Sequence, residues 1–568
     1  MRRYYEATSP DSAAPHGTPP RGAGGRTVRT CIDSAPTFAS VTTEAMRATA
    51  TRLFAHNDVG ALETGALPVS ITDIPAAGTE PPQPEQSPPD AAHESPPGSD
   101  RSRPSRSGPA RAVQALAMRL HFYAGVFVAP FILIAAVTGA LYAAAPSIES
   151  IVNRDLLHVD STGPARPLSE QIAAGVAAEP TLALVAVDPA QHAGDTTRVI
   201  FSDPSLGESE RRAVFVDPAT ATSVGDSVVY GSTGALPMRT WIDVLHRNLH
   251  LGDAGRLYSE MAASWMWIIA LAGVVMWLRR SRGSARRLLW PDRSKSGRPR
   301  SVSWHAAVGM WIVLPLLFLS ATGMTWSQYA GQHITSLRQQ LSWTTPVVNT
   351  ALPGAPMPSM PAGGEHADHT GGHHMPMPVS ADRAAQADKV LAVARGHGID
   401  GPVEITIPAK DTTAFTVKER RLSGVYTQDA IAVDGKTGDV TDILRYADWP
   451  LVAELANWGI ALHMGMLFGL ANQLLLLATM IALITVIGRG YLMWWRRRPT
   501  RENSPFSFGR APARGVLRRA PLWISIPLVA ITVGIGWFAP VLGVSLLAFL
   551  IVDIVAGLIA RRRRGVVA

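Results

Sequence analysis

The sequence predicts a membrane-embedded bundle of about six helices, built from a duplicated two-helix unit, with two small α+β domains outside the membrane. Three observations predict this fold. Apolar residues make up 47% of the 568 residues and gather in blocks close to the ~20 residues needed to cross a bilayer. Basic residues flank these blocks. Several residues also recur at identical offsets in two halves of the chain.

Six apolar segments account for the predicted helices of the bundle. The last two share one long stretch, 520–560, in which the Gly-Trp-Phe-Ala-Pro run at 536–540 introduces a helix breaker. We therefore expect a helical hairpin there instead of one long span. The other four predicted spans are 120–143, 258–278, 305–327 and 474–495.

Charge predicts how the spans are oriented. Residues 279–300 contain nine Lys or Arg and residues 496–520 contain eight Arg, which marks both segments as cytoplasmic by the positive-inside rule. The loop 281–304, the basic tail 561–568 and both termini are then cytoplasmic, and the two long segments between paired spans are extracytoplasmic. We expect a multi-pass protein of a bacterial inner membrane, with the bilayer as its partner. The net charge of +8 does not indicate nucleic-acid binding, because the basic residues lie at span ends.

Residues 1–110 are rich in Pro, Ser, Ala, Gly and Thr and have no apolar period, so we expect a disordered tail. A start further along the chain, for example at Met118, is an alternative. The single cysteine, Cys31, excludes a disulfide within one chain.

An internal repeat organises the rest of the chain. The first unit, 119–280, and the second, 304–498, each begin with a His, followed by a Gly four residues later and a Thr-Gly pair seventeen residues later. Each second span is preceded by a Trp and, five residues later, a His. The matched residues are His121, Gly125, Thr138, Gly139, Trp241 and His246 in the first unit, and His305, Gly309, Thr322, Gly323, Trp458 and His463 in the second.

The segments between the paired spans repeat as well. Each opens with a helix-like stretch, continues with alternating strand-like runs and contains a Val-Asp-x-x-Thr sequence that suits a turn between strands, at 216–220 and 433–437. We expect small α+β domains at about 155–235 and 381–446. The second unit also contains a Pro-, Met- and His-rich insertion, 346–378.

The repeated histidines are the candidate ligands. His121 and His305 begin spans at the cytoplasmic side, whereas His246, His250 and His463 precede spans at the other side. A low-spin haem needs two axial ligands, which facing helices provide. One haem could be held by His121 and His305, and another by His463 with either His246 or His250, which has no counterpart in the second unit. The alternative is that these are interfacial histidines.

The insertion offers a second kind of site. Imidazole and thioether groups together suit copper, although a solvated low-complexity linker is an equal alternative. Its candidate ligands are His366, His369, His373, His374, Met375 and Met377.

Asp553, in the middle of the last span, is an intramembrane charge that we expect to be hydrogen-bonded against another helix. The chain has no zinc-protease motif, no phosphate-binding loop and no dinucleotide fingerprint, so any electron donor must be another molecule.

Together, the repeated His-x-x-x-Gly and Thr-Gly residues, the Trp-x-x-x-x-His sequences and the Val-Asp-x-x-Thr turns resemble the PepSY-associated transmembrane family over residues 119–498. This resemblance implies PepSY-like extracytoplasmic domains and, by similarity to iron-regulated ferric-siderophore reductases, two b-type haems. It implies ligand roles for His121, His305, His246 and His463. It further implies an oxidoreductase that takes electrons from a cytoplasmic donor and reduces a ferric chelate outside the membrane.

Two other hypotheses stay open. In one, the PepSY-like domains bind peptides or regulate a peptidase, and the histidines are structural. In the other, the His/Met-rich insertion binds or delivers copper.

Overall fold

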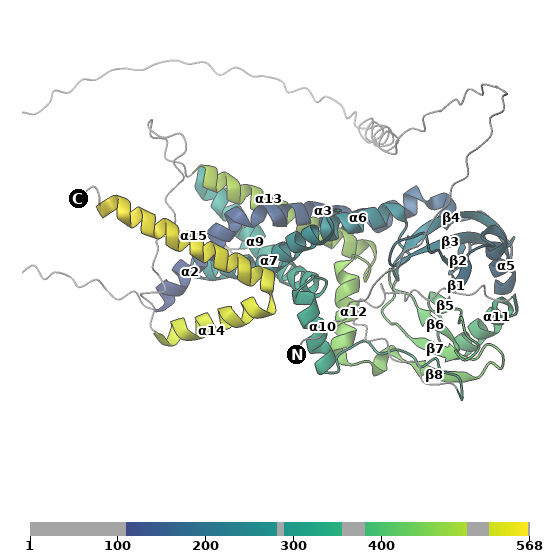
Figure 1. Ribbon diagram of the computed structural model, residues 1–568. Coiled ribbons are helices and arrows are strands. Elements are labelled where there is room, and N and C mark those ends of the chain that lie inside the picture. The colour runs from purple at the N-terminus through teal and green to yellow at the C-terminus, as the bar shows by residue number, and fades with distance from the viewer. Residues whose placement is uncertain (1–108, 281–288, 355–380, 497–521, 566–568) are drawn as a thin grey trace, which may run out of the picture. The chain divides into compact units, whose positions relative to one another are not determined.

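The computed structural model describes residues 109–280, 289–354, 381–496 and 522–565 (Figure 1). Within these ranges the chain forms a set of apolar helices and one antiparallel β-sheet. The predicted disordered tail lies outside the described residues except for its last two positions, which begin a helix.

Five helices among the described residues are long and apolar enough to cross a membrane, judged by length and composition. A sixth apolar helix, α14 (Leu522–Phe538), is shorter, so the exact number of spans stays a prediction. The five long helices are α3 (Ala129–Val152), α7 (Gly252–Arg280), α9 (Gly297–Thr325), α13 (Leu470–Trp495) and α15 (Pro540–Gly565).

The first predicted span, 120–143, is divided in the structure. It comprises the end of α2 (Pro109–Phe127) and the beginning of α3, with a break at Val128. Pro130 causes the break, because it has no N–H to donate to the carbonyl of Val126, four residues earlier. The hydroxyl of Tyr491 on α13 donates to that carbonyl instead, at 2.9 Å. The break therefore attaches the second repeat to the first.

The spans of the two repeats pack side by side in one bundle. Helix α7 packs against α2 and α9, and α13 packs against α3 and α9. The shared interior combines small residues such as Ala136 and Ala262 with larger ones such as Trp265 and Leu483. Each repeat thus packs its two spans against each other and against the spans of the other repeat.

The C-terminal hairpin of α14 and α15 is attached by polar contacts. Asp553 accepts a hydrogen bond from Arg119 of α2 at 2.8 Å, and the indole N–H of Trp265 donates to Ser545 at 2.8 Å. His333 donates from Nδ1 to the carbonyl of Phe538 at 2.8 Å. Asp553 is therefore hydrogen-bonded to a neighbouring helix, as the sequence predicts.

The sheet is made by two segments of the same design, each a helix followed by four antiparallel strands. The first segment contains α5 (Leu168–Ala178), β1 (Ala183–Asp188), β2 (Thr197–Ser202), β3 (Glu210–Asp217) and β4 (Thr222–Tyr230). The second contains α11 (Ala381–Gly396), β5 (Val403–Thr406), β6 (Phe415–Glu419), β7 (Ala430–Val433) and β8 (Val440–Leu444).

These two segments form one continuous sheet, which the sequence analysis did not predict. Strand β1 pairs antiparallel with β5, and the order is β4-β3-β2-β1-β5-β6-β7-β8 (Figure 1). A buried ion pair crosses this junction, with Arg420 3.0 Å from Asp188. The sheet domain is therefore a single unit with both repeats in it.

Alternating side chains give the sheet two apolar faces. Val187 and Phe201 belong to the core shared with α5 and α11, whereas Ala186, Ile200 and Phe215 belong to a cluster on the other face. Both predicted turns occur, and in each the Asp side chain accepts a hydrogen bond from the backbone N–H two residues later. Short helices complete the described elements: α4 (Arg154–Leu157), α6 (Pro237–Asn248), α10 (Ala330–Gln340), the 3₁₀ helix η2 (Tyr446–Asp448) and α12 (Leu451–His463).

The N-terminus of α5 is capped by the other half of the sheet domain. Its N-cap residue is Pro167, whose side chain cannot accept a hydrogen bond. Asp388 of α11 instead accepts from the backbone N–H groups of Leu168 and Ser169, at 2.6 and 3.0 Å. The carboxylate also carries the charge that a helix N-terminus favours.

We predict that Asp388→Ala destabilises α5 locally by about 1 kcal/mol, the usual cost of losing a helix cap. Amide hydrogen exchange in residues 168–172 should become about fivefold faster. Asp400→Ala is the control, because Asp400 is exposed and lies four residues after the end of α11, the helix that carries Asp388. Unchanged exchange in the Asp388 variant would contradict the capping role.

Candidate functional site

His121 and His305 form the first histidine pair. They lie on α2 and α9, and their ring centroids are 5.9 Å apart with the ring planes nearly perpendicular. Nδ1 of His121 is 2.9 Å from the carbonyl oxygen of Ile269 on α7, and Nδ1 of His305 is 2.9 Å from that of Val486 on α13. Each ring is therefore oriented by a second span of its own repeat.

These contacts define the tautomer of both rings. A carbonyl oxygen can only accept a hydrogen bond, so each Nδ1 carries the proton and donates it. The Nε2 atom of a neutral ring then keeps its lone pair. Metal-binding histidines usually have this arrangement, in which one ring nitrogen donates to the protein and the other is left for the metal.

Glycines leave space beside the two rings. A Cβ atom placed on Gly273 would lie 3.3 Å from Cε1 of His121, and one placed on Gly490 would lie 3.6 Å from Cε1 of His305. Each Gly is one helical turn beyond the residue whose carbonyl accepts the hydrogen bond, so carbonyl and Gly share a helix face. The ring thus rests against bare backbone.

His246 and His463 form the second histidine pair, on α6 and α12. Nδ1 of His246 is 2.9 Å from the hydroxyl oxygen of Thr138, and Nδ1 of His463 is 2.6 Å from that of Thr322. Both threonine hydroxyls donate their own proton to the carbonyl four residues earlier, at 2.9 and 2.8 Å. The hydroxyls therefore accept from Nδ1, and this pair has the same tautomer as the first.

The Gly that follows each Thr has the same role here as in the first pair. A Cβ atom on Gly139 would lie 3.2 Å from Cε1 of His246, and one on Gly323 would lie 3.8 Å from Cε1 of His463. In each repeated Thr-Gly pair, the Thr hydroxyl thus accepts the hydrogen bond of the histidine, and the Gly leaves space for the histidine ring.

The second pair is held neutral. Removal from water lowers the pKa of His246, and it lowers the pKa of His463 to about 3, with a further contribution from the nearby His246. A neutral imidazole is the form that binds a metal, so neither ring has to lose a proton at neutral pH.

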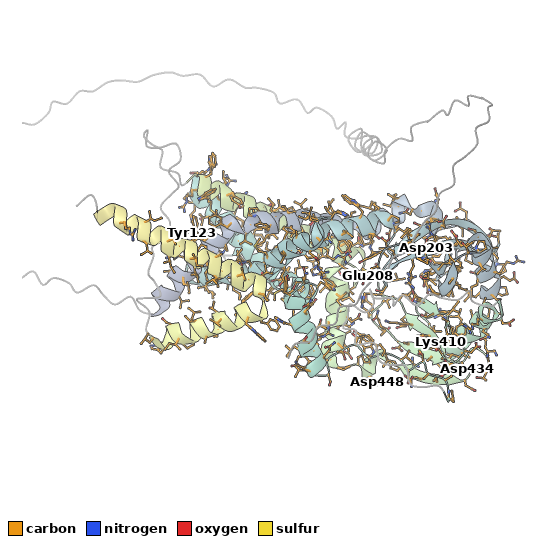
Figure 2. The ribbon with its side chains drawn as sticks, in the orientation of Figure 1. Tyr123, Asp203, Glu208, Lys410, Asp434 and Asp448 are labelled. Carbon is orange, nitrogen blue, oxygen red and sulfur yellow. The ribbon has the colours of Figure 1, made fainter. Side chains whose placement is uncertain are left out.

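A cavity of about 720 Å³ opens beside the second pair. His246, His463 and the small residues Gly139 and Gly323 line it together with apolar side chains such as Met480. The cavity continues to the sheet domain, where Glu208 lines its other end (Figure 2). Its volume is in the range of cofactor and substrate sites.

The structure separates His250 from His246. Leu249 and His250 both have positive φ angles, which form a turn directly after α6. His250 is exposed, stacks on Trp241 at 4.9 Å and is not among the residues that line the cavity. Of the two predicted partners for His463, only His246 lies with it.

The two pairs occupy different levels of the helices that carry them. In both repeats the first His and the Thr that orients the second His are seventeen residues apart. In α9, which is continuous from His305 to Thr322, this separation is about 25 Å at 1.5 Å per residue. Tyr123, two residues after His121, lies among the helices, far from Glu208 beside the sheet (Figure 2). The pairs are therefore two sites.

The predicted copper ligands His366, His369, His373, His374, Met375 and Met377 lie outside the described residues. Within the described ranges no group of three or more His, Cys, Asp or Glu side chains is arranged to hold a metal ion.

Four residues of the site were not identified from sequence. They are Ile269 and Val486, which accept the hydrogen bonds of the first pair, and Gly273 and Gly490, which adjoin its rings. A signal was present, because Gly273 follows His246 by 27 residues and Gly490 follows His463 by the same number.

One family model, described as the PepSY-associated TM region, matches residues 118–497. Among curated proteins no match is found. The matched range contains both histidine pairs, all four glycines beside them and the whole sheet domain. Because the match covers more than half of the sequence and confirms the predicted resemblance, this chain belongs to the PepSY-associated TM family.

Proposed function

We propose that this protein is an inner-membrane electron-transfer protein that binds two b-type haems and reduces ferric chelates on the extracytoplasmic side. The observation that supports the proposal is the common state of the four paired histidines. Each donates from Nδ1 to the protein and has Nε2 left for a metal.

The residues of the first pair fit a haem with two histidine ligands. Imidazoles that bind one metal ion from opposite sides have ring centroids roughly 6 Å apart, because each metal–nitrogen bond is roughly 2 Å long. The rings of His121 and His305 are 5.9 Å apart. The second pair fits through its cavity, which His246 and His463 both line.

The protein's own residues would hold and orient the cofactors. A haem between each pair would supply reversible one-electron chemistry. The carbonyls of Ile269 and Val486 would fix the rings of the first pair, and the hydroxyls of Thr138 and Thr322 those of the second. Such hydrogen bonds raise the basicity of the ligand nitrogen and so influence reduction potential.

The charge pattern of the sequence supports a direction of electron transfer, from the cytoplasmic to the extracytoplasmic side. Basic flanks favour a cytoplasmic location for the first pair and an extracytoplasmic location for the second pair with its cavity. The substrate Fe(III), bound in the cavity, gains one electron that comes from a donor on the cytoplasmic side. The product Fe(II) is a softer cation than Fe(III), and oxygen ligands hold it less tightly.

We predict about two b-type haems per chain in the detergent-purified protein. His121→Ala and His463→Ala should each remove about one haem, because each variant leaves one pair intact. His250→Ala is the control and should retain both, since His250 is exposed outside the cavity. The measurement is a reduced-minus-oxidised visible spectrum with haem extracted and counted per chain.

A protein without haem, purified from cells that make haem, would exclude the electron-transfer function and favour the peptide-binding hypothesis. Deletion of residues 356–378 should leave the spectrum unchanged. If this deletion, and none of the histidine substitutions, removes bound copper from the purified protein, the copper hypothesis is favoured.

We further predict that Thr322→Val weakens haem binding by His463 about 10- to 100-fold, the usual effect of removing the partner that orients a metal-binding histidine. Thr322→Ser should restore binding, because the hydroxyl returns. Thr485→Val is a matched control: Thr485 also donates to the carbonyl four residues earlier, at 2.9 Å, but it makes no hydrogen bond to a histidine among the described residues. Equal haem content in the Thr322 and Thr485 valine variants would mean that the hydroxyl does not orient the ligand.

A further inference from the structure

The cavity beside the second histidine pair has two chemically different ends. The end within the bundle is lined by small and apolar residues such as Ala136, Leu476 and Met480. The end at the sheet domain is lined by hydroxyl groups and charged side chains from both repeats, including Thr233 and Thr344. A molecule that reaches His246 and His463 must therefore pass or occupy the charged end.

Cationic side chains predominate there. Six of the residues that line the cavity are Arg or Lys and three are Asp or Glu. One cation is compensated, because Arg239 is 3.5 Å from Glu149, a buried carboxylate that does not line the cavity. Five cationic side chains against three acidic ones still leave an excess of positive charge, in a recess where screening by water is reduced.

Arg247, near the end of α6, and Arg256, near the beginning of α7, are two of the remaining cationic residues that line the cavity. Arg247 donates to the hydroxyl of Tyr230 at 2.9 Å, and Arg256 donates to the carbonyl of Trp326 at 3.3 Å. Both partners are neutral, so the guanidinium charges are retained. The Nε atom of each is buried and has no acceptor among the described residues. A buried donor of this kind is costly unless an acceptor is supplied.

Lys418 of β6 adds a third cation from the second repeat. Its side chain is half-buried and lines the cavity. Neither Lys418 nor the two arginines has a carboxylate within ion-pair distance in the part of the chain that the structure describes. Because the three residues come from α6, α7 and β6, their charges converge on one volume from different directions.

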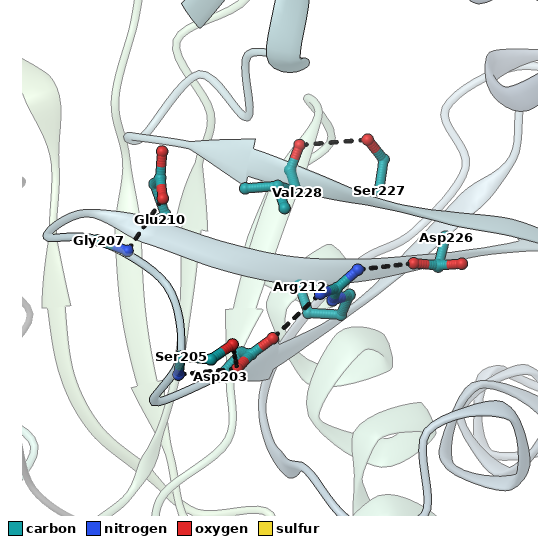
Figure 3. Close-up of polar contacts among 8 residues, drawn as sticks. All are labelled: Asp203, Ser205, Gly207, Glu210, Arg212, Asp226, Ser227 and Val228. Atoms are coloured by element: carbon teal, nitrogen blue, oxygen red, sulfur yellow. Dashed lines mark hydrogen bonds and ion pairs between the residues drawn. The ribbon is translucent and has the colours of Figure 1, made fainter. Parts of the chain in front are cut away.

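The acidic residues of this end are partly engaged. Glu208 lies in the loop between β2 and β3, and Glu210, the first residue of β3, accepts a hydrogen bond from the backbone N–H of Gly207 at 2.9 Å (Figure 3). Arg212 fastens the same loop by donating to Asp203 at 3.2 Å and to Asp226 at 2.9 Å (Figure 3). Glu210 is therefore held by its own hairpin. Asp243, one turn before Arg247 on α6, attracts it electrostatically from beyond ion-pair distance, and Arg247, Arg256 and Lys418 make no ion pair among the described residues.

We propose that the charged end of the cavity selects a ferric chelate with net negative charge, of the class whose carboxylate oxygens are exposed around the metal. The inference rests on the proposed function for the identity of the metal and adds the class of chelator. Guanidinium groups bind carboxylates with charge-assisted hydrogen bonds, and Arg247 and Arg256 both line the cavity. A chelate with net positive charge would be repelled by the same residues.

The test measures binding without electron transfer. Gallium(III) forms chelates like those of iron(III) but does not accept an electron under these conditions. The full-length protein in nanodiscs of zwitterionic lipid is titrated with the anionic gallium(III) complex of citrate and with the cationic gallium(III) complex of a trihydroxamate that carries a free ammonium group. The expected Kd for the citrate complex is at least about tenfold lower, and the difference shrinks as NaCl is raised.

Arg247→Gln combined with Arg256→Gln should raise the Kd of the citrate complex about tenfold or more. Arg154→Gln is the control, because Arg154 is an exposed arginine that does not line the cavity. Lys418→Gln should raise the Kd severalfold and serves as the test should the double variant fail to fold. Equal affinity for the two gallium complexes, or an unchanged Kd in these variants, overturns the proposal.

The outcomes separate this inference from the proposed function. Selective binding of the citrate complex by a protein that contains no haem would support the binding site and exclude the reductase. A haem protein that is reoxidised by ferric chelates and binds both gallium complexes equally would support the reductase and exclude the selectivity.

Discussion

The hydrogen bond at Nδ1 of each paired histidine is the constraint on which the rest of the structure depends. An imidazole among apolar helices is unfavourable unless its N–H finds an acceptor. In the first pair the acceptor is a backbone carbonyl of α7 or α13, and in the second it is a threonine hydroxyl of α3 or α9. Each of these contacts joins two helices of one repeat at a defined level. The same hydrogen bonds therefore fix both the packing of the helices and the orientation of the candidate ligands.

The glycines follow from the same constraint. A glycine beside the acceptor lets the ring lie close to the backbone of the neighbouring helix. Gly139 and Gly323 provide this space next to the threonines, and Gly273 and Gly490 provide it one turn beyond the carbonyls. Small residues let helices approach closely in many membrane proteins. Here the glycines make room for a histidine side chain that extends from a neighbouring helix.

Much of the bundle could be predicted because its signals are local or periodic. His121 and His305 share the same offsets to Gly and to Thr-Gly, and an apolar block of the right length needs no tertiary information. The pairing of β1 with β5 could not be predicted, because it joins segments about 220 residues apart through backbone groups that any sequence supplies. Asp388 capping α5 and Arg119 binding Asp553 are equally remote in sequence. Gly273 and Gly490 could not be predicted as site residues, because Gly is common in transmembrane helices and a single Gly in an apolar segment is not distinctive.

The β1–β5 pairing also bears on how the two repeats can differ in their surface residues. A protein with one repeat would have a four-stranded sheet with an unpaired edge at β1. In a twofold-symmetric dimer, the β1 strand of a second copy would pair with this edge. Fusing both copies into one polypeptide releases each from having to match the other. Arg247 stands where the second repeat has Met464, and His250 stands where it has Leu467. Covalent linkage of the two repeats lets one half carry surface residues that the other lacks, while both keep the shared framework.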